Sequence, residues 1–362
     1  MSERVFMKGC EAVAEAAVRA GCRFFAGYPI TPQNEVPEYF ARRLPEVNGT
    51  FLQGESEVAS VNMVYGASCA GVRCMTSSSS CGISLKSEGI SWLAASSLPA
   101  VICNFSRGGP GIGSIQPAQQ DYNQATKASG NGGFRMLVLA PATVQEAVDM
   151  TYAAFDYADK YRKPVLLLID GFIGAMMEPV VLPPMKSDEE LTAIREAKRD
   201  WTSRGRKGGH VHSILGGVGL SKLRQQDLNE QDAALYESWQ QNETEVETYL
   251  TEDAEYILTG YGTSARICKS AVDVLRAEGL KFGLIRPKKL YPFPEEEFRK
   301  LDCSRVKGVL SVEMSIPAQY AVDVRHATPD CIPVETSLRS GGEIVERVDI
   351  LKAARAMADK EV

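Results

Sequence analysis

A regular alternation of helical segments and short apolar segments over the first ~185 residues constrains this chain most. Helical periodicity separates short stretches of continuous apolar character. The predicted strands are 23–26, 50–53, 72–76, 100–105, 136–139 and 165–169. The predicted helices are 11–20, 32–44, 56–70, a segment ending near 95, and 144–161. Strands that are apolar throughout occur where both faces of a sheet are covered. The pattern predicts an α/β fold, a doubly wound parallel sheet whose ligand site lies at the carboxyl ends of the strands.

A second, smaller α/β segment follows a polar stretch. Charged residues and glutamine dominate 186–250, and the part at 225–250 is predicted to be one long polar helix. Alternation then resumes, with predicted strands at 256–259, 281–285 and 308–312 and predicted helices at 265–277, 295–300 and 349–358. We therefore predict an α/β domain at 1–185, a connector at 186–252 and a second α/β domain at 253–362.

Composition excludes several classes of function. The net charge of −6 offers no basic surface to a nucleic-acid backbone. The longest apolar stretches, such as 164–169, are far shorter than a membrane span, and no signal-peptide block opens the sequence, so we expect a cytoplasmic protein. The nine cysteines are odd in number, scattered and without a Cys-x-x-Cys pair. We expect buried thiols rather than a disulfide framework, a metal site or an iron–sulfur cluster on this chain.

The loop at 27–33 joins a predicted strand to a predicted helix. Pro29 and Pro32 fix the backbone φ angle and restrict the residues before them, so the loop is rigid. Thr31 stands where the next helix is predicted to begin, and the helix dipole there favours an anionic group such as a carboxylate. A simple helix cap is the commoner role for such a threonine, and both interpretations stay open on the sequence alone.

Glu55 and Glu57 precede a helix that is otherwise rich in alanine, valine and methionine. Most acidic pairs at the start of a helix only complement its dipole. Glu57, however, is followed by Val58, Ala59 and Val61, and a glutamate that enters an apolar region needs a partner. A ring nitrogen of a cofactor could be that partner.

Two further loops follow predicted strands. The serines at 77–80 either cap the next helix or line a pocket. Arg107 precedes a glycine-rich loop, 108–113, whose backbone can approach a ligand closely. This loop lacks the Gly-Lys-Ser/Thr ending of a phosphate-binding loop, and Pro110 breaks the dinucleotide-binding spacing. An arginine at this place is better suited to a bidentate grip on a carboxylate.

Three motifs, in this order and spacing, resemble those of the 2-oxoacid:ferredoxin oxidoreductase family. They are Tyr-Pro-Ile-Thr-Pro at 28–32, Glu-x-Glu at 55–57 followed by Gly66, and Arg-Gly-Gly-Pro at 107–110. The resemblance spans nearly the whole chain and is strongest to the α-type subunit of the branched-chain member, which acts on 2-oxoisovalerate (3-methyl-2-oxobutanoate). It implies a domain that binds the pyrimidine ring of thiamine diphosphate, and a smaller domain like the C-terminal domain of transketolase.

The resemblance implies roles for particular residues. Glu57 matches the glutamate that contacts N1′ of the cofactor's aminopyrimidine ring, and is the expected catalytic residue. Thr31 matches the threonine that meets the 2-oxo acid, and Arg107 matches the arginine that holds the substrate's carboxylate. The other residues expected at the cofactor are Tyr28, Pro29, Ile30, Ser78 and Ser79.

The resemblance also implies partners and a reaction. The sequence has no Gly-Asp-Gly…Asn signature, so a β-type subunit is expected to supply the Mg²⁺ and diphosphate site, with the active site between subunits. A γ-type subunit and a ferredoxin-like subunit carrying 4Fe–4S clusters would complete the complex. The implied reaction is the oxidative decarboxylation of a 2-oxo acid to acyl-CoA and CO₂, with coenzyme A as co-substrate and ferredoxin as electron acceptor.

Several alternatives and departures accompany this interpretation. The alternatives are an α subunit that acts on 2-oxoglutarate, a non-catalytic scaffold subunit, and a non-oxidative thiamine decarboxylase. The stretch 131–134 replaces the usual Gly-His-Gly-Asp, and Lys288 and Lys289 replace apolar or hydroxyl residues. These departures leave the substrate open. A basic loop with Arg204, Arg206 and Lys207 suits a solvated surface better than a site for coenzyme A phosphates.

Overall fold

A seven-stranded sheet organises the N-terminal part of the chain. The computed structural model describes residues 4–127, 129–203, 205 and 222–359. The strands, in their order across the sheet, are β12 (Lys289–Tyr291), β6 (Leu137–Leu139), β7 (Val165–Asp170), β5 (Val101–Ser106), β4 (Cys74–Ser78), β2 (Phe24–Gly27) and β3 (Thr50–Gln53). All neighbours pair in parallel except β12, which is antiparallel to β6. The predicted parallel sheet is confirmed.

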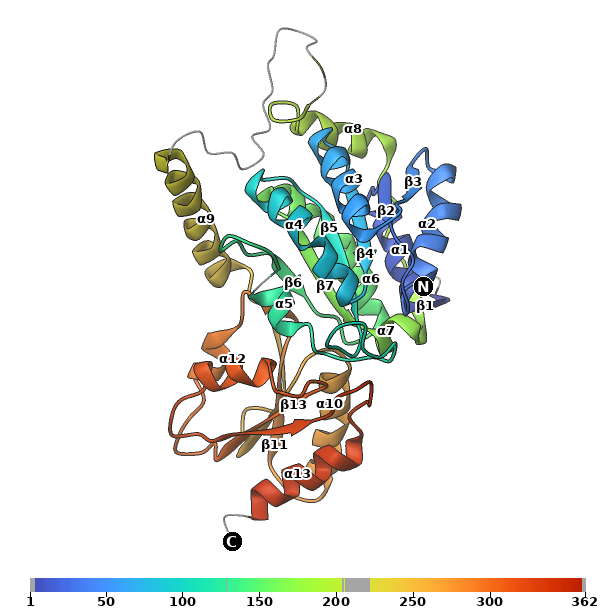
Figure 1. Ribbon diagram of the computed structural model, residues 1–362. Helices are drawn as coiled ribbons and strands as arrows, with labels where there is room; N and C mark the ends of the chain where they lie inside the picture. The colour runs from blue at the N-terminus through green and yellow to red at the C-terminus, as the bar shows by residue number, and fades with distance from the viewer. Residues whose placement is uncertain (1–3, 128, 204, 206–221, 360–362) are drawn as a thin grey trace.

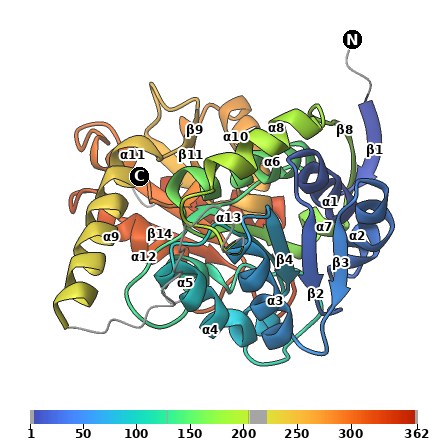
Figure 2. The ribbon, with the colours of Figure 1, turned by 90° about the horizontal axis from the view of Figure 1, so that it is seen from above.

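Helices cover both faces of this sheet (Figures 1 and 2). The helices of this part are α1 (Gly9–Arg19), α2 (Glu35–Glu46), α3 (Glu57–Cys69), α4 (Cys81–Ala95), α5 (Tyr122–Thr126), α6 (Val144–Tyr161) and α7 (Gly171–Ala175). Side chains of α1, α2 and α6, such as Val13, Phe40 and Phe155, share one core cluster. Side chains of α3 and α4, such as Val61 and Ile90, share another on the opposite face. This two-sided burial is why the inner strands β6 and β7 are apolar along most of their length.

A five-stranded sheet forms the second unit, at the bottom of Figure 1. Its strands, in order across the sheet, are β14 (Val334–Leu338), β13 (Gly308–Glu313), β10 (Tyr256–Thr259), β11 (Phe282–Pro287) and β9 (Val246–Tyr249). The remaining helices of the chain are α8 (Asp188–Ala197), α9 (Lys222–Asn242), α10 (Gly262–Ala277), α11 (Glu295–Arg299), α12 (Tyr320–Ala327) and α13 (Arg347–Asp359). The predicted domain boundaries stay a prediction, and two strands cross them. β9 lies within the predicted connector, and β12 from the second segment joins the first sheet.

One predicted helix ends too late, and one pair of strands was not predicted. The polar helix predicted at 225–250 is wrong at its C-terminal end, because α9 stops at Asn242 and β9 pairs antiparallel with β11. Glu247 on β9 accepts a hydrogen bond from the buried Arg286 on β11 (2.7 Å), and this partner favours the extended strand. The sequence also gave no sign of a two-stranded ribbon, β1 (Arg4–Lys8) with β8 (Met177–Val181).

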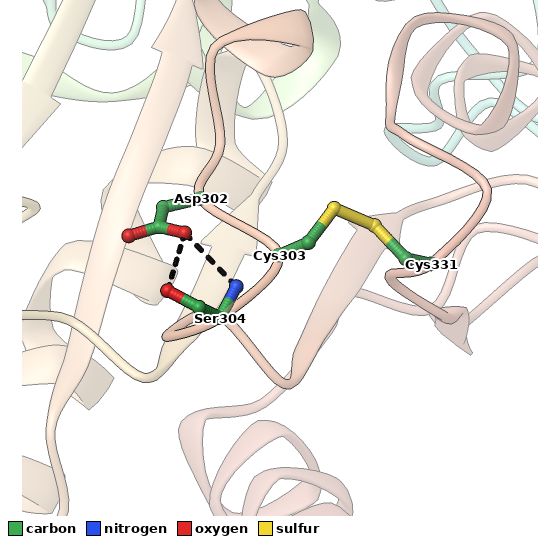
Figure 3. Close-up of a disulfide and its surroundings, with 4 residues drawn as sticks. All are labelled: Asp302, Cys303, Ser304 and Cys331. Atoms are coloured by element: carbon green, nitrogen blue, oxygen red, sulfur yellow. Dashed lines mark hydrogen bonds between the residues drawn. A yellow bond between two sulfur atoms is a disulfide. The ribbon is translucent and has the colours of Figure 1, made fainter.

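Cys303 and Cys331 form a disulfide that the number and spacing of the cysteines did not predict (Figure 3). Their Cα atoms lie 6.0 Å apart although 28 residues separate them in the sequence. Figure 3 places Cys303 beside a turn in which Asp302 accepts hydrogen bonds from Ser304. The other cysteines are free thiols, and Cys10, Cys22, Cys74, Cys103 and Cys268 are buried as expected.

Two further expectations concern the basic loop and the location of the protein. Arg204, Arg206 and Lys207 lie outside the described residues. No helix in the described part of the chain combines the length and apolar character needed to cross a membrane. The cytoplasmic location stays a prediction.

A cluster of charges fastens α9 to the first unit. Glu243, just after α9, accepts hydrogen bonds from Lys289 of β12 (2.9 Å), from Lys160 of α6 (3.0 Å) and from the Tyr161 hydroxyl. Lys289, which departs from the family pattern, is itself buried. Burial raises the pKa of Glu243, but the hydrogen bonds from Tyr161, Lys289 and Lys160 outweigh it and lower the pKa to about 2. The burial of a lysine at position 289 is therefore explained by its ion pair with Glu243.

We predict that Glu243→Gln lowers the free energy of unfolding at pH 7 by about 2–3 kcal/mol, because it leaves the buried Lys289 without its counter-charge. A carboxyl group with a lowered pKa stabilises the fold above the pKa of the unfolded chain, and this contribution is lost as pH falls toward about 2. The difference from wild type should therefore shrink between pH 7 and about 3 in urea unfolding. Glu245→Gln, at a more exposed carboxylate, is the control with an effect below about 0.5 kcal/mol. A difference that stays constant over this pH range would contradict the assignment.

Candidate functional site

The order of the strands brings four of the predicted loops to one edge of the sheet. β3, β2, β4 and β5 are consecutive parallel neighbours, so their carboxyl ends point the same way. The segments that leave them carry Thr31, Glu57, the serines at 77–80 and Arg107. Ligands bind at this edge in open α/β sheets.

Glu57 is the first residue of α3, and its side chain is buried, with only 6% exposed. The hydroxyl of Ser56 caps the helix by accepting a hydrogen bond from the Ala59 N–H (3.1 Å), so Glu57 is not needed as the cap. Within the described part of the chain, the Glu57 carboxylate has no hydrogen-bond donor and no ion pair. The neighbouring Glu55 is exposed. A buried carboxylate without a partner is costly, and a ligand that donates a hydrogen bond would remove this cost.

Gly82 allows Glu57 and Ser78 to pack closely against the start of α4. A Cβ atom at Gly82 would lie 2.7 Å from Oε1 of Glu57 and 2.1 Å from Oγ of Ser78. Both oxygens therefore occupy the space that a side chain at position 82 would need. The hydroxyls of Ser78 and Ser79 are buried and have no hydrogen-bond partner. The structure brings Glu57 and Ser78 together at Gly82, which the sequence did not reveal, and their role at a cofactor stays a prediction.

Arg107 and Thr31 are in direct contact, through the backbone of Thr31. Nη1 of Arg107 donates to the Thr31 carbonyl (2.7 Å), and Nη2 donates to the Ile112 carbonyl (2.9 Å). Nη2 also lies 3.3 Å from Sγ of Cys81. The guanidinium is buried, and its Nε has no partner. The two Nη atoms thus hold the loops, and Nε is a donor without a partner that a ligand could use.

The interpretation of Thr31 as a helix cap is wrong. α2 begins at Glu35, and its N-cap residue is Asn34. Residues 31–33 form a turn, in which the Gln33 N–H donates to the Ile30 carbonyl (3.0 Å). The side chain of Thr31 is thereby free of a capping role.

The first residues of the loop after β2 lie at the surface of the chain. Tyr28 and Pro29 are exposed, while Ile30 is partly buried. No contact places these three residues beside Glu57, so their role at a cofactor stays a prediction. Gln33 is wholly buried and accepts a hydrogen bond from the Ser77 hydroxyl (2.5 Å), which ties the loops after β2 and β4.

A buried polar network supports Arg107 from behind. Asp121 accepts hydrogen bonds from the Ser80 hydroxyl (2.6 Å) and from the Asn104 amide (3.0 Å). The Ser80 hydroxyl in turn accepts the backbone N–H of Arg107 (2.9 Å). Burial raises the pKa of Asp121, against the effect of these hydrogen bonds. The sequence signal for this network was Asn104, a polar residue inside an otherwise apolar strand.

Comparisons with known proteins agree on the type of chain. The family described as "Pyruvate flavodoxin/ferredoxin oxidoreductase, thiamine diP-bdg" matches residues 15–247, and "Pyruvate:ferredoxin oxidoreductase core domain II" matches 254–350. Ketoisovalerate oxidoreductase subunit VorB of Methanothermobacter marburgensis is 43% identical over 97% of both chains. 2-Oxoglutarate synthase subunit KorA of Archaeoglobus fulgidus is 37% identical over 82% of this chain and 84% of its own length.

Two solved structures share the fold. One is a 2-oxoglutarate:ferredoxin oxidoreductase from Magnetococcus marinus with 2-oxoglutarate, coenzyme A and succinyl-CoA bound. It matches with a TM-score of 0.87 at 24% identity, over 98% of this chain, and this chain spans 65% of that one. The other is a split-gene transketolase, with a TM-score of 0.59 at 14% identity over 98% of both chains. At these identities the likeness is one of fold, and it confirms the predicted fold class.

We predict that Gly82→Ala lowers the free energy of unfolding by about 1–3 kcal/mol, because the new methyl group must displace Ser78 or Glu57. Gly66→Ala is the matched control, since Gly66 lies in α3 with nothing within 4 Å of the added Cβ. That variant should gain about 0.5–1 kcal/mol from helix propensity. Urea unfolding of the two variants measures both effects. Equal stability of Gly82→Ala and wild type would show that Ser78 and Glu57 do not pack this closely against Gly82 in solution.

Proposed function

This chain belongs to the 2-oxoacid:ferredoxin oxidoreductase family, and from that premise we propose that it holds the pyrimidine ring of thiamine diphosphate in an enzyme for branched-chain 2-oxo acids. The observation that supports the proposal is the buried Glu57, whose carboxylate receives no hydrogen bond in the described part of the chain and lies close to Ser78 at Gly82. The expected products are acyl-CoA and CO₂, with electrons passing to ferredoxin.

The residues around Glu57 fit the aminopyrimidine ring. The ring needs a carboxyl group at N1′ and polar neighbours that can exchange hydrogen bonds with its other nitrogens. Ser78 and Ser79 offer buried hydroxyls without hydrogen-bond partners, and Glu57 is buried without a donor to its carboxylate in the described part of the chain. When bound, thiamine diphosphate supplies the nucleophilic carbon that attacks the keto group and takes up the electrons left when CO₂ departs. Glu57 would hold or release a proton at N1′, and burial would keep water away from this exchange.

Arg107 and Thr31 would bind and orient the substrate. The free Nε of Arg107 and the side chain of Thr31 lie on adjacent loops, held together by the bond from Nη1 to the Thr31 carbonyl. A guanidinium fixed in this way loses little freedom when it binds a carboxylate. Orientation of the acid relative to the reacting carbon lowers the entropic part of the barrier.

The proposed active site lies between this chain and a β-type subunit. Exposed apolar side chains flank the site on α3 and α4, namely Val58, Leu85 and Trp92. Val58 directly follows Glu57 in the sequence, and an apolar surface of this kind suits a subunit interface. The β-type subunit would supply Mg²⁺ and the diphosphate site. A γ-type subunit and a ferredoxin-like subunit with 4Fe–4S clusters would complete the complex, and coenzyme A would accept the acyl group.

The proposed substrate is 2-oxoisovalerate. Its support is the identity of 43% to a ketoisovalerate oxidoreductase subunit, against 37% to a 2-oxoglutarate synthase subunit. 2-Oxoglutarate is the second candidate, because that relative still matches most of the chain. A scaffold subunit without catalytic residues would not need to keep Glu57 buried and unpaired.

We predict that Glu57→Gln lowers turnover of the reconstituted complex by at least about 100-fold, because the amide cannot exchange a proton with the ring. The matched control is Glu55→Gln, two residues away and exposed, which should leave turnover unchanged. Viologen reduction measures turnover, and gel filtration shows whether each complex assembles. Normal turnover of an assembled Glu57→Gln complex would end the proposal.

We predict that Arg107→Lys raises KM by about 10–100-fold for every 2-oxo acid tested, because a lysine ammonium cannot hold the Thr31 and Ile112 carbonyls as the guanidinium does and also present a fixed donor to the shared carboxylate. The panel contains 2-oxoisovalerate, 2-oxoglutarate and pyruvate, and kcat/KM of the wild type should be highest for 2-oxoisovalerate. Arg42→Ala, at an exposed arginine, is the control. A KM unchanged by Arg107→Lys would remove its role, and a preference for 2-oxoglutarate would overturn the proposed substrate.

A further inference from the structure

A glycine turn of the second unit packs directly on the loop that follows Arg107. The turn lies after β14, begins at Ser340 and ends at Glu343, whose N–H donates to the Ser340 carbonyl (3.3 Å). Gly341 and Gly342 form its centre, with φ angles of +72° and +93°. A turn with positive φ at both central residues favours glycine, because a Cβ atom is strained there.

The loop after Arg107 is closed by its own hydrogen bonds at the place where the glycine turn touches it. The Gly108 N–H donates to the Gln116 carbonyl (3.0 Å), and the Ser114 N–H donates to the Gly108 carbonyl (2.9 Å). A Cβ atom added at Gly342 would overlap with Cβ of Gln116 and would lie 2.9 Å from Oγ of Ser114. From the other side, a Cβ atom added at Gly108 would lie 3.4 Å from the backbone nitrogen of Gly342. The backbone of the turn thus lies against the residues that close the loop.

The second unit also holds the chain just beyond this loop. The buried Gln119 donates its N–H to the Met314 carbonyl (2.9 Å), and its side-chain oxygen accepts the Met314 N–H (3.0 Å). The same oxygen accepts a hydrogen bond from the Ser264 hydroxyl (2.7 Å). These bonds fix the segment after the loop to the end of β13, and the glycine turn adds a second point of contact on the loop itself.

The guanidinium of Arg107 depends on the place of this loop. Nη2 of Arg107 donates to the Ile112 carbonyl (2.9 Å), within the loop, and Nη1 donates to the Thr31 carbonyl (2.7 Å), on a different loop. A side chain held from two loops changes direction when one of them shifts. A displacement of about 1 Å at a group that orients a substrate can cost about 100-fold in rate.

We propose that Gly342 is a positioning residue, through which the glycine turn of the second unit sets the place of the loop after Arg107 and so the direction of the guanidinium. The inference rests on the proposed function only for what Arg107 binds, the carboxylate of a 2-oxo acid. It gives the second unit a part in substrate binding, although Thr31 and Arg107, the residues proposed to meet the substrate, lie in the first unit.

The test compares alanine at the two adjacent glycines of the turn. Gly342→Ala places a methyl group against Gln116 and Ser114, whereas Gly341→Ala places one where no atom of the described residues lies within 4 Å. Both positions have positive φ, so backbone strain is common to the two variants and contact with the loop is the difference. In the reconstituted complex, we expect Gly342→Ala to raise KM for 2-oxoisovalerate and pyruvate by about 10-fold with kcat within about threefold, and Gly341→Ala to leave both constants unchanged.

A second substitution tests whether the effect passes through the loop. Gln116→Gly removes the side-chain atoms that the new methyl group meets first. In the Gln116→Gly background, Gly342→Ala should therefore change KM by less than about twofold. A change in KM that Gln116→Gly does not rescue would overturn the inference. If Gly342→Ala fails to fold, Gly342→Asn takes its place, because asparagine adopts positive φ more readily than alanine.

Hydrogen–deuterium exchange of the full chain without cofactor gives a readout that is independent of activity. Peptides that cover residues 108–118 should exchange faster in Gly342→Ala than in wild type, because the hydrogen bonds that close the loop are weakened. The same peptides should exchange at the wild-type rate in Gly341→Ala. Equal exchange in all three proteins would overturn the inference.

Failure of the inference is distinguishable from failure of the proposed function. An unchanged KM in Gly342→Ala, in an enzyme whose KM does respond to Arg107→Lys, would overturn the inference alone. If KM responds to neither variant, the proposed role of Arg107 toward the substrate fails, whereas faster exchange in Gly342→Ala still supports the positioning of the loop.

Discussion

Parallel pairing of β2 with β3 and β4, and of β4 with β5, fixes the carboxyl ends of four strands along one edge. Every group in the candidate site depends on that alignment. The segments that carry Thr31, Glu57, Ser78 and Arg107 are far apart in the sequence, and hydrogen bonding between the strands alone makes them neighbours. The side-chain contacts then refine the arrangement: Gln33 ties one loop to the next through Ser77. A register shift in this sheet would separate all of these groups at once.

Polar groups are buried in two different ways in this chain. Where α9 meets the first unit, Glu243 and Lys289 satisfy each other, and the cluster adds to stability. At the sheet edge, the Ser78 hydroxyl and Nε of Arg107 are buried without partners, and the buried Glu57 receives no hydrogen bond to its carboxylate in the described part of the chain. Groups left in this state reduce stability, and proteins can keep them where a ligand completes their hydrogen bonds.

Local sequence patterns predicted six of the seven strands of the first sheet, because short apolar stretches alternate with helical segments. Glu57 was found for a similar reason, as a charge that runs into an apolar helix. Gly82 was missed, because its importance comes from the side chains of Ser78 and Glu57 that face it. The bond between Cys303 and Cys331 was missed on the same ground, since spacing alone does not bring two turns together. The start of α2 was misplaced because the prolines around Thr31 resemble a helix entry but form a separate turn.

The path of the chain through β12 has a further consequence. This short strand comes from the C-terminal segment, yet it pairs with β6 and closes one border of the N-terminal sheet. A fragment ending before residue 289 would leave the backbone groups of β6 unpaired on that side. Such an open border invites pairing between molecules and hence aggregation. If the chain were divided into two polypeptides, β12 would therefore have to stay on the one that contains the N-terminal sheet.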